Sequence, residues 1–106
     1  MEFLALQRKL EADNVRWFGV DWKKIPLWYW ALALAGEAGE MCNLVKKQLR
    51  DGTDTKQAVA DELADIVIYA LLQASVMGID LEAAVLRKCE KIDYRNMKGV
   101  VNLLQD

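Results

Sequence analysis

The chain has 106 residues, 54% of them hydrophobic, which is enough for one domain with a real core. Fourteen basic and sixteen acidic residues give a net charge of -2, so binding to nucleic acid or to an anionic membrane is not expected. There is no histidine, and Cys42 and Cys89 lie far apart in apolar surroundings. This pattern predicts reduced core thiols in a cytoplasmic protein.

The N-terminal segment has the spacing of an amphipathic helix. Apolar residues at Phe3, Leu6 and Leu10 predict a first helix over roughly residues 2–13, followed by an aromatic-rich loop. The segment is charged and lacks the basic-then-apolar order of a signal peptide, so we expect no export.

A second helix is predicted to begin near Pro26, because a proline in the first turn loses no helical hydrogen bond. It should run to about Arg50, with Asp51-Gly52 as its stop. The uncharged run over residues 25–36 is shorter than the roughly 20 residues that cross a bilayer. It is better interpreted as a buried helix or a subunit interface.

Two further helices follow. Asp54, with a glutamine three residues later, resembles a helix cap, and the third helix should end near Gly78. Asp80 can cap a fourth helix that runs to about residue 97. The remaining segment, residues 99–106, is not assigned to any element.

The predicted fold is therefore all-α. No segment alternates with period two for long enough to indicate a strand, and short loops favour antiparallel neighbours. We expect a single domain over residues 1–106, a four-helix bundle of antiparallel helices that assembles as a homo-oligomer.

Four acidic residues stand out within these helices. Glu37 and Glu40 are three residues apart and project from one helix face, and Glu62 and Asp65 repeat the spacing on the next helix. Asp65 is the only charged residue in a long apolar run, which predicts that it is substantially buried. If the two helices pack antiparallel around Asp51-Gly52, the four carboxylates come to one level.

Such a cluster predicts a metal site. Like-charged carboxylates in a partly apolar cleft repel, which raises their pKa values or recruits cations. Oxygen ligands favour Mg²⁺, with Mn²⁺ a plausible substitute, and the absence of histidine excludes the Glu-x-x-His motifs of helical di-iron proteins. The alternative for each pair alone is a solvated helix face.

The motifs "GEAGE", "DELADIVIY" and "GIDLEAAVLRKCEK" resemble the MazG-like nucleoside triphosphate pyrophosphohydrolases of the all-α NTP pyrophosphatase superfamily. The resemblance implies a helical bundle that assembles as a homodimer or homotetramer. It also implies Mg²⁺-dependent hydrolysis of a nucleoside triphosphate between the α and β phosphates. It also implies that Glu37, Glu40, Glu62 and Asp65 are the metal-binding and catalytic residues, with one glutamate orienting or deprotonating the attacking water.

Basic and aromatic residues are candidates for substrate contacts. Tyr69 lies one turn beyond Asp65, where the family often has a group near the substrate; a core tyrosine is the alternative. The members of one basic face on the fourth helix suit triphosphate oxygens, although solvated basic residues are common there. These residues are Lys88, Lys91 and Arg95. Ile92 departs from the asparagine that the family commonly has at this position.

Six aromatic residues lie within fourteen positions around the start of the second helix. Aromatic rings can stack on a nucleobase, but core and subunit packing should take most of them. Trp22 is the first candidate for base stacking, because some relatives place a tryptophan about 15 residues before the first metal-binding glutamate, and Trp17 is the second.

These observations favour a cytoplasmic (d)NTP pyrophosphohydrolase. Phosphoribosyl-ATP pyrophosphatase, which shares the helical carboxylates, is an alternative enzyme. A non-catalytic bundle that binds a nucleotide or a partner protein is the alternative outside enzymes. Metal-dependent turnover and the identity of the product separate the three.

Overall fold

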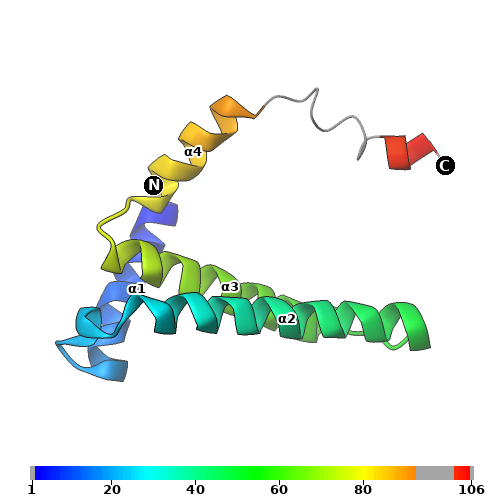
Figure 1. Ribbon diagram of the computed structural model, residues 1–106, viewed down its shortest axis with the longest axis horizontal. Helices are drawn as coiled ribbons and strands as arrows, with labels where there is room; N and C mark the ends of the chain where they lie inside the picture. Colours follow the sequence, from blue (N-terminus) through cyan, green and yellow to red (C-terminus); the bar gives the residue numbers. More distant parts are fainter. Residues whose placement is uncertain (1, 93–101, 106) are drawn as a thin grey trace.

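A computed structural model describes residues 2–92 and 102–105 of the chain. It contains four α-helices and two short 3₁₀ helices, and these described residues contain no strand (Figure 1). The elements are α1 (Glu2–Phe18), η1 (Trp22–Lys24), α2 (Leu27–Asp51), α3 (Lys56–Val76), α4 (Leu81–Lys91) and η3 (Asn102–Gln105). The all-α prediction is confirmed.

The second helix begins and ends close to its predicted signals. Pro26 is the residue directly before α2, and its carbonyl accepts a hydrogen bond from the N–H of Tyr29 at 3.0 Å. At the other end Gly52 takes a φ of 71°, which glycine adopts without strain, and donates its N–H to the Gln48 carbonyl at 2.9 Å.

The starts of the next two helices also follow the predicted caps. The Asp54 carboxylate accepts a hydrogen bond from the Lys56 N–H at 3.1 Å, although Thr55 is the boundary residue of α3. The Asp80 carboxylate accepts from the Ala83 N–H at 3.1 Å, a true N-cap. α4 ends at Lys91, and Ile92 after it is extended, so the helix does not continue as predicted; its predicted end near residue 97 lies outside the described residues.

The first helix is longer than the predicted 2–13. It continues to Phe18, because residues around the predicted helix end form ion pairs at helical spacing. The Asp13 carboxylate pairs with Lys9 one turn before it, at 2.6 Å, and with Arg16 almost one turn after it. Gly19, with a φ of 91°, then terminates α1.

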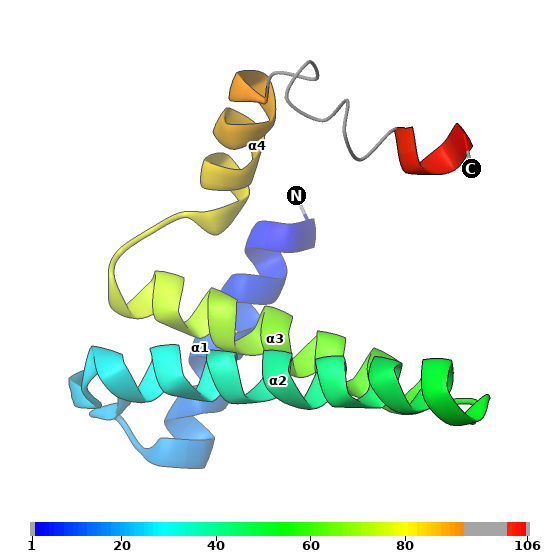
Figure 2. The ribbon, with the colours of Figure 1, turned by 45° about the vertical axis from the view of Figure 1, so that its right-hand side comes forward.

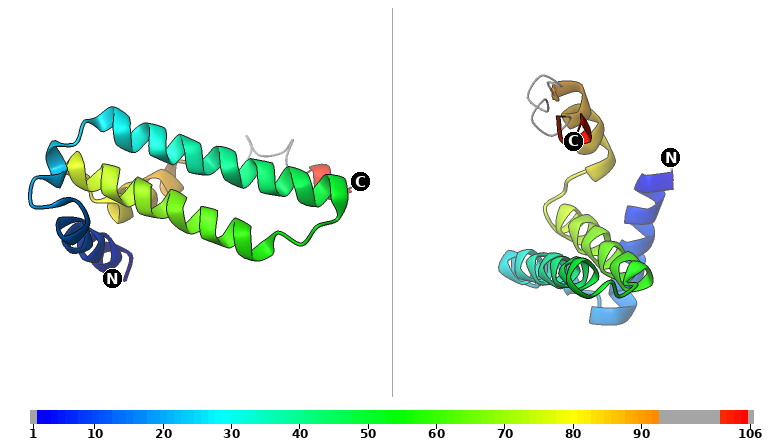
Figure 3. Two further views of the ribbon diagram at one scale, coloured as in Figure 1. Left: turned by 90° about the horizontal axis from the view of Figure 1, so that it is seen from below. Right: turned by 90° about the vertical axis from the view of Figure 1, so that its right-hand side faces the viewer.

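The helices form an open arrangement around one hairpin. α2 and α3 lie side by side and antiparallel along their length, as Figure 3 shows from below. α1 crosses α3 steeply, and α4 leads away from the hairpin (Figure 2). Of the predicted antiparallel four-helix bundle, the single chain therefore forms one antiparallel pair, and a closed bundle is not confirmed.

The core lies where α1, η1, α2 and α3 meet. Its buried members are Leu10, Trp22, Trp30, Leu71 and Leu72. Trp30 is fully buried, and its ring lies within 6.4 Å of four other rings, centroid to centroid. Because these rings come from every element around the core, Trp30 ties the elements together.

The two cysteines differ from the sequence prediction. Cys42 and Cys89 are exposed free thiols, so their prediction as core residues is wrong. Their apolar neighbours in sequence occupy other faces of α2 and α4. Within the described residues no single helix is long and apolar enough to cross a membrane. Taken together, α3 and α4 have the length and composition of a membrane span, but the chain bends by 105° between them.

A buried amide joins α1 to the turn between α3 and α4. The Gln7 amide nitrogen donates to the Ser75 hydroxyl at 3.1 Å and to the Ile79 carbonyl at 2.9 Å, and its oxygen accepts from the Leu81 N–H at 3.3 Å. Both the nitrogen and the oxygen of this amide are therefore hydrogen-bonded to residues at the turn. Gln7 therefore fixes where α1 meets α3.

Replacing Gln7 by alanine should lower the free energy of unfolding by about 2–3 kcal/mol, because it leaves buried donors and acceptors without partners. Urea denaturation followed by circular dichroism measures the change. Gln57→Ala is the control, since that amide is exposed and donates a hydrogen bond to Asp61, one turn away on α3. We expect it to cost at most about 0.5 kcal/mol. Equal midpoints for the two variants would contradict the structural role of Gln7.

Candidate functional site

Three of the four predicted acids converge at the middle of the hairpin. Glu37 and Glu40 come from α2 and Glu62 from α3, and one carboxylate oxygen of each lies within 4.8 Å of the others. Their i, i+3 spacing and the antiparallel pairing of the helices produce this arrangement. Glu37 and Glu62 are half-buried, and Glu40 is exposed.

Crowding of these acids changes the protonation of Glu62. The Glu37 carboxyl, close enough to share a proton, raises the pKa of Glu62 to about 7, and burial and the charges of Glu37 and Glu40 act in the same direction. Glu62 Oε2 is buried without a hydrogen-bond partner among the described residues. A buried carboxylate oxygen that faces two more carboxylates is satisfied best by a cation.

The raised pKa predicts how the metal-free protein responds to pH. The folded state holds a proton on Glu62 up to about pH 7, whereas the unfolded state releases it near the ordinary value of 4.5. The folded state therefore binds more protons between these values, and its stability falls as the pH rises through this window. Glu62→Gln should remove that fall.

Thermal melts of the metal-free protein at about pH 5.5 and pH 8 test this expectation. The wild type should melt lower at the higher pH, and Glu62→Gln should show a smaller difference. Saturating Mg²⁺ should raise the melting temperature more at pH 8, since binding displaces the proton. The same pH dependence in both proteins would mean that Glu62 carries no such proton. Asp13 and Asp51 have lowered pKa values, through bonds to Lys9 and Arg50, and titrate below this window.

The fourth predicted acid, Asp65, is not part of the three-acid cluster. It lies one turn further along α3, is half-buried rather than deeply buried, and lines an adjacent cavity with Tyr69. Burial first, and then the neighbouring Tyr29, Glu37 and Asp65, raise the pKa of Tyr69. Tyr69 therefore lines the cavity with its hydroxyl close enough to Glu37 and Asp65 for both charges to act on it.

This cavity, of about 220 Å³, separates the end of α1 from the middle of α3. Aromatic, apolar and polar side chains line it. They are Asn14, Trp17, Phe18, Asp65, Ile68, Tyr69 and Leu72. The sequence prediction missed Asn14, which it left in a loop. The available signal was an asparagine, a poor helix former, on the same face of α1 as Gln7 and Leu10.

The structure separates the two tryptophans that were candidates for base stacking. Trp22 is 3% exposed and packs edge-on against Trp30 in the core, with ring centroids 6.0 Å apart. Trp17 is 54% exposed and lines the cavity beside Asp65. Within one chain, Trp17 is therefore the one of the two that a ligand in the cavity could reach.

The basic candidates lie on another part of the molecule. Lys88 and Lys91 are exposed near the end of α4, the helix that leads away from the hairpin (Figure 1). Arg95 lies outside the described residues. The single chain thus does not bring the two described lysines to the acid cluster.

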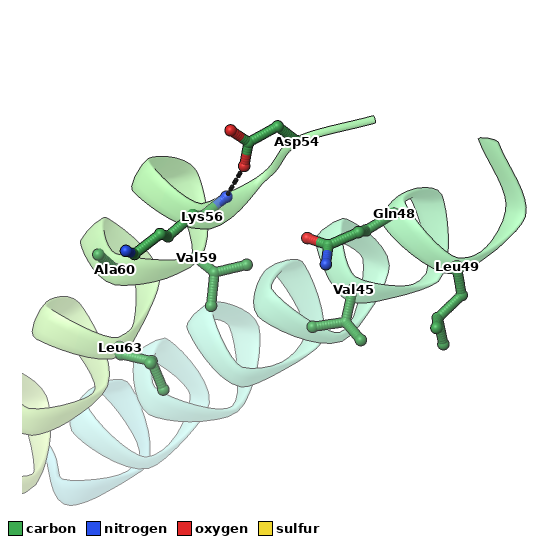
Figure 4. Close-up of a pocket in the computed structure, with 8 residues that line it drawn as sticks. All are labelled: Val45, Gln48, Leu49, Asp54, Lys56, Val59, Ala60 and Leu63. Carbon is green, nitrogen blue, oxygen red and sulfur yellow. Dashed lines mark hydrogen bonds between the residues drawn. The ribbon is translucent and has the colours of Figure 1, made fainter. Parts of the chain in front are cut away.

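A larger cavity, of about 590 Å³, lies at the closed end of the hairpin, away from the acids. Figure 4 shows its lining, which is mainly Val45, Leu49, Val59 and Leu63 with a few polar side chains. None of the clustered acids lines it. Its apolar character fits contact with protein better than the binding of a charged substrate.

Comparison with known proteins agrees with this geometry. The model of the MazG nucleotide pyrophosphohydrolase domain matches residues 29–100, which include all four acids. The "Gene 37 protein" of Mycobacterium phage L5 is 36% identical over 78 residues, which cover 69% of this chain and 68% of the phage protein. No solved structure matches the chain. Because the family model covers most of the chain, the protein belongs to the MazG nucleotide pyrophosphohydrolase domain family.

Proposed function

We propose that the protein is a Mg²⁺-dependent nucleoside triphosphate pyrophosphohydrolase that converts a (d)NTP to the monophosphate and pyrophosphate. The observation that carries the proposal is the convergence of Glu37, Glu40 and Glu62 beside a cavity, in a chain that belongs to the MazG family. House-cleaning of the nucleotide pool in the cytoplasm is the role that we propose for this activity. Two exposed free thiols support a reducing compartment.

The residues of the cluster fit a hard divalent cation. One oxygen from each of the three carboxylates lies within 4.8 Å of the other two, close enough for these side chains to hold one divalent cation together. The unpartnered Glu62 Oε2 and the elevated pKa of Glu62 are the signs of a site that lacks positive charge. When bound, Mg²⁺ would neutralise triphosphate charge and lower the pKa of water; Mn²⁺ is a plausible substitute.

The side chains then have distinct roles. Glu37, Glu40 and Glu62 would hold the metal, and Asp65, one turn along α3, would complete the set from the cavity side. A glutamate of the cluster would orient the attacking water. The Tyr69 hydroxyl, close to Glu37 and Asp65, can hydrogen-bond to the nucleotide where its sugar and phosphates meet.

Pyrophosphate release from the eight canonical NTPs and dNTPs, with Mg²⁺ and with a chelator, tests the function. Release with Mg²⁺ alone would establish the reaction and rank the bases. If folded protein releases no pyrophosphate from any of the eight nucleotides, modified nucleotides or phosphoribosyl-ATP become the next substrates to test, and a non-catalytic bundle follows.

We also propose that the protein works as a homodimer or homotetramer. Val45, Leu49 and Leu63 are exposed around the apolar groove of Figure 4, and α4 buries none of its residues. Packing against a second copy would cover these surfaces and complete a helical bundle. It would also give Lys88 and Lys91 a route to the phosphates bound at the acids of another copy.

Light scattering at micromolar concentration should accordingly give at least twice the mass of one chain. Leu49→Glu should lower the mass to that of a monomer, because it places a charge in the groove. Val20→Glu is the control, since Val20 is as exposed but lies beyond α1, away from the groove. A monomeric wild type would refute the proposal.

A further inference from the structure

Two buried amides lie on one face of α1, and they differ in their partners. Gln7 has hydrogen bonds to Ser75, Ile79 and Leu81. Asn14, two turns later, is 0% exposed, yet neither its amide nitrogen nor its amide oxygen has a hydrogen-bond partner among the described residues. Burial of an amide without partners is costly, so an unsatisfied Asn14 needs an explanation.

The surroundings of Asn14 indicate that the missing partner is a ligand. Asn14 lines the cavity between α1 and α3, and Trp17 and Phe18 line the same cavity. Both rings are about half exposed, and Phe18 is fixed by an edge contact with Trp30 at 6.1 Å. Flat aromatic walls around a carboxamide suit a flat heteroaromatic ring that carries its own donors and acceptors.

The size and position of the cavity fit one part of a nucleotide. At about 220 Å³ it is smaller than the roughly 300–1,000 Å³ of pockets that enclose a whole small molecule. Asp65 lines it, and Glu62 of the acid cluster is one helical turn away, about 4.5 Å along α3. A base in the cavity would leave the sugar near Tyr69 and the phosphates at the acids.

We propose, resting on the nucleotide substrate of the proposed function, that the α1/α3 cavity holds the nucleobase and that the Asn14 carboxamide is the residue that reads it. A carboxamide presents one donor beside one acceptor, and each base has an edge with the complementary pair. Because the carboxamide can rotate by about 180° and so exchange its donor and acceptor, asparagine can pair with the N3–H/O4 edge of uracil and with the N3/N4–H₂ edge of cytosine. An aspartate offers acceptors only, so one of its oxygens would face the acceptor of either edge, O4 of uracil or N3 of cytosine.

Equilibrium binding of α,β-imido-dUTP and α,β-imido-dCTP with Mg²⁺, measured by calorimetry, tests the proposal without turnover. Asn14→Leu should weaken both by about 10- to 100-fold. Binding of inorganic tripolyphosphate, which has no base, should not change. Asn14→Asp should also weaken both analogues, because one carboxylate oxygen would face the acceptor of either base.

Thermal melts give a second measurement. Asn14→Leu should melt at or above the wild-type temperature, because an apolar side chain replaces an unpaired buried amide. Gln7→Leu is the matched control: a satisfied amide on the same face, whose loss should lower the melting temperature without changing the affinity for either analogue.

The outcomes are distinguishable. Unchanged analogue binding by Asn14→Leu, an equal loss of tripolyphosphate binding, or a melting temperature below that of the wild type would overturn the role of Asn14. Failure of the wild type to bind either analogue would overturn the base site itself. Analogue binding that depends on Asn14, without pyrophosphate release from any nucleotide, would instead refute the proposed hydrolase and leave this inference intact.

Discussion

Glu62→Gln is expected to reduce pyrophosphate release by at least about 100-fold while the helices remain folded. Changes in the groups that merely support metal ligands cost about 10- to 100-fold, and the loss of a ligand should cost more. Glu62 is the only member of the three-acid cluster from α3, so its carboxylate is the one that closes the site across the hairpin. Asp65→Asn should have the same effect if Asp65 completes the set.

The fold should survive because the mutation removes repulsion. Glu62 lies against two other carboxylates, and a neutral amide at this position keeps the shape without the charge. Circular dichroism should show unchanged helix content, and Mn²⁺ binding followed by electron paramagnetic resonance should be weakened along with activity.

Asp61→Asn is a close control for this experiment. Asp61 precedes Glu62 on α3, but it is exposed and accepts a hydrogen bond from Gln57 at 3.2 Å instead of joining the cluster. Its amide variant should keep full activity and metal binding. Unchanged turnover in both Glu62→Gln and Asp65→Asn would refute the site.

Local signals predicted much of the secondary structure. The helices begin or end within one residue of Pro26, Gly52 and Asp80. These residues mark helix ends through conformational and capping preferences that depend little on the rest of the fold. The end of α1 was missed because its last turn is held by ion pairs of Asp13 with Lys9 and Arg16, which local propensity does not include.

The site was predictable where it depends on helix periodicity. Spacing of three residues put Glu37 beside Glu40, and equal distances from the turn put Glu40 opposite Glu62. The cavity was not predictable, because it depends on the angle at which α1 crosses α3. That angle decides that Asn14 and Trp17 face Asp65, and no pattern within one helix encodes it.

The sequence also does not show which tryptophan of the aromatic cluster is buried, and the effect of replacing that residue can be predicted from the structure. Trp28 and Trp30 are two positions apart on α2, so they project from different faces, but the sequence does not say which one is buried. In the structure Trp28 is 65% exposed and Trp30 is fully buried. The two tryptophans therefore form a natural pair for measuring the cost of core packing.

Trp30→Ala should lower the free energy of unfolding by about 3–5 kcal/mol, a large part of the roughly 5–15 kcal/mol expected for a chain of this size. Trp30 meets the rings of Phe18 and Tyr69, with centroids 6.1 and 6.4 Å away, and both of these residues also line the cavity. The variant should thus lose nucleotide binding at urea concentrations below those that unfold the wild type. Trp30→Phe should cost less than half as much, because it keeps a ring and removes the buried indole N–H that has no partner among the described residues.

Trp28→Ala is the matched comparison, with the same substitution on the same helix at an exposed position. Because little of its ring leaves water on folding, the change in the free energy of unfolding should stay within about 0.5 kcal/mol. Urea denaturation of the three variants beside the wild type, followed by circular dichroism, measures all of these changes. Equal destabilisation by Trp28→Ala and Trp30→Ala would mean that the core is not centred on Trp30. It would also mean that Trp30 does not hold Phe18 and Tyr69 in their positions along the cavity.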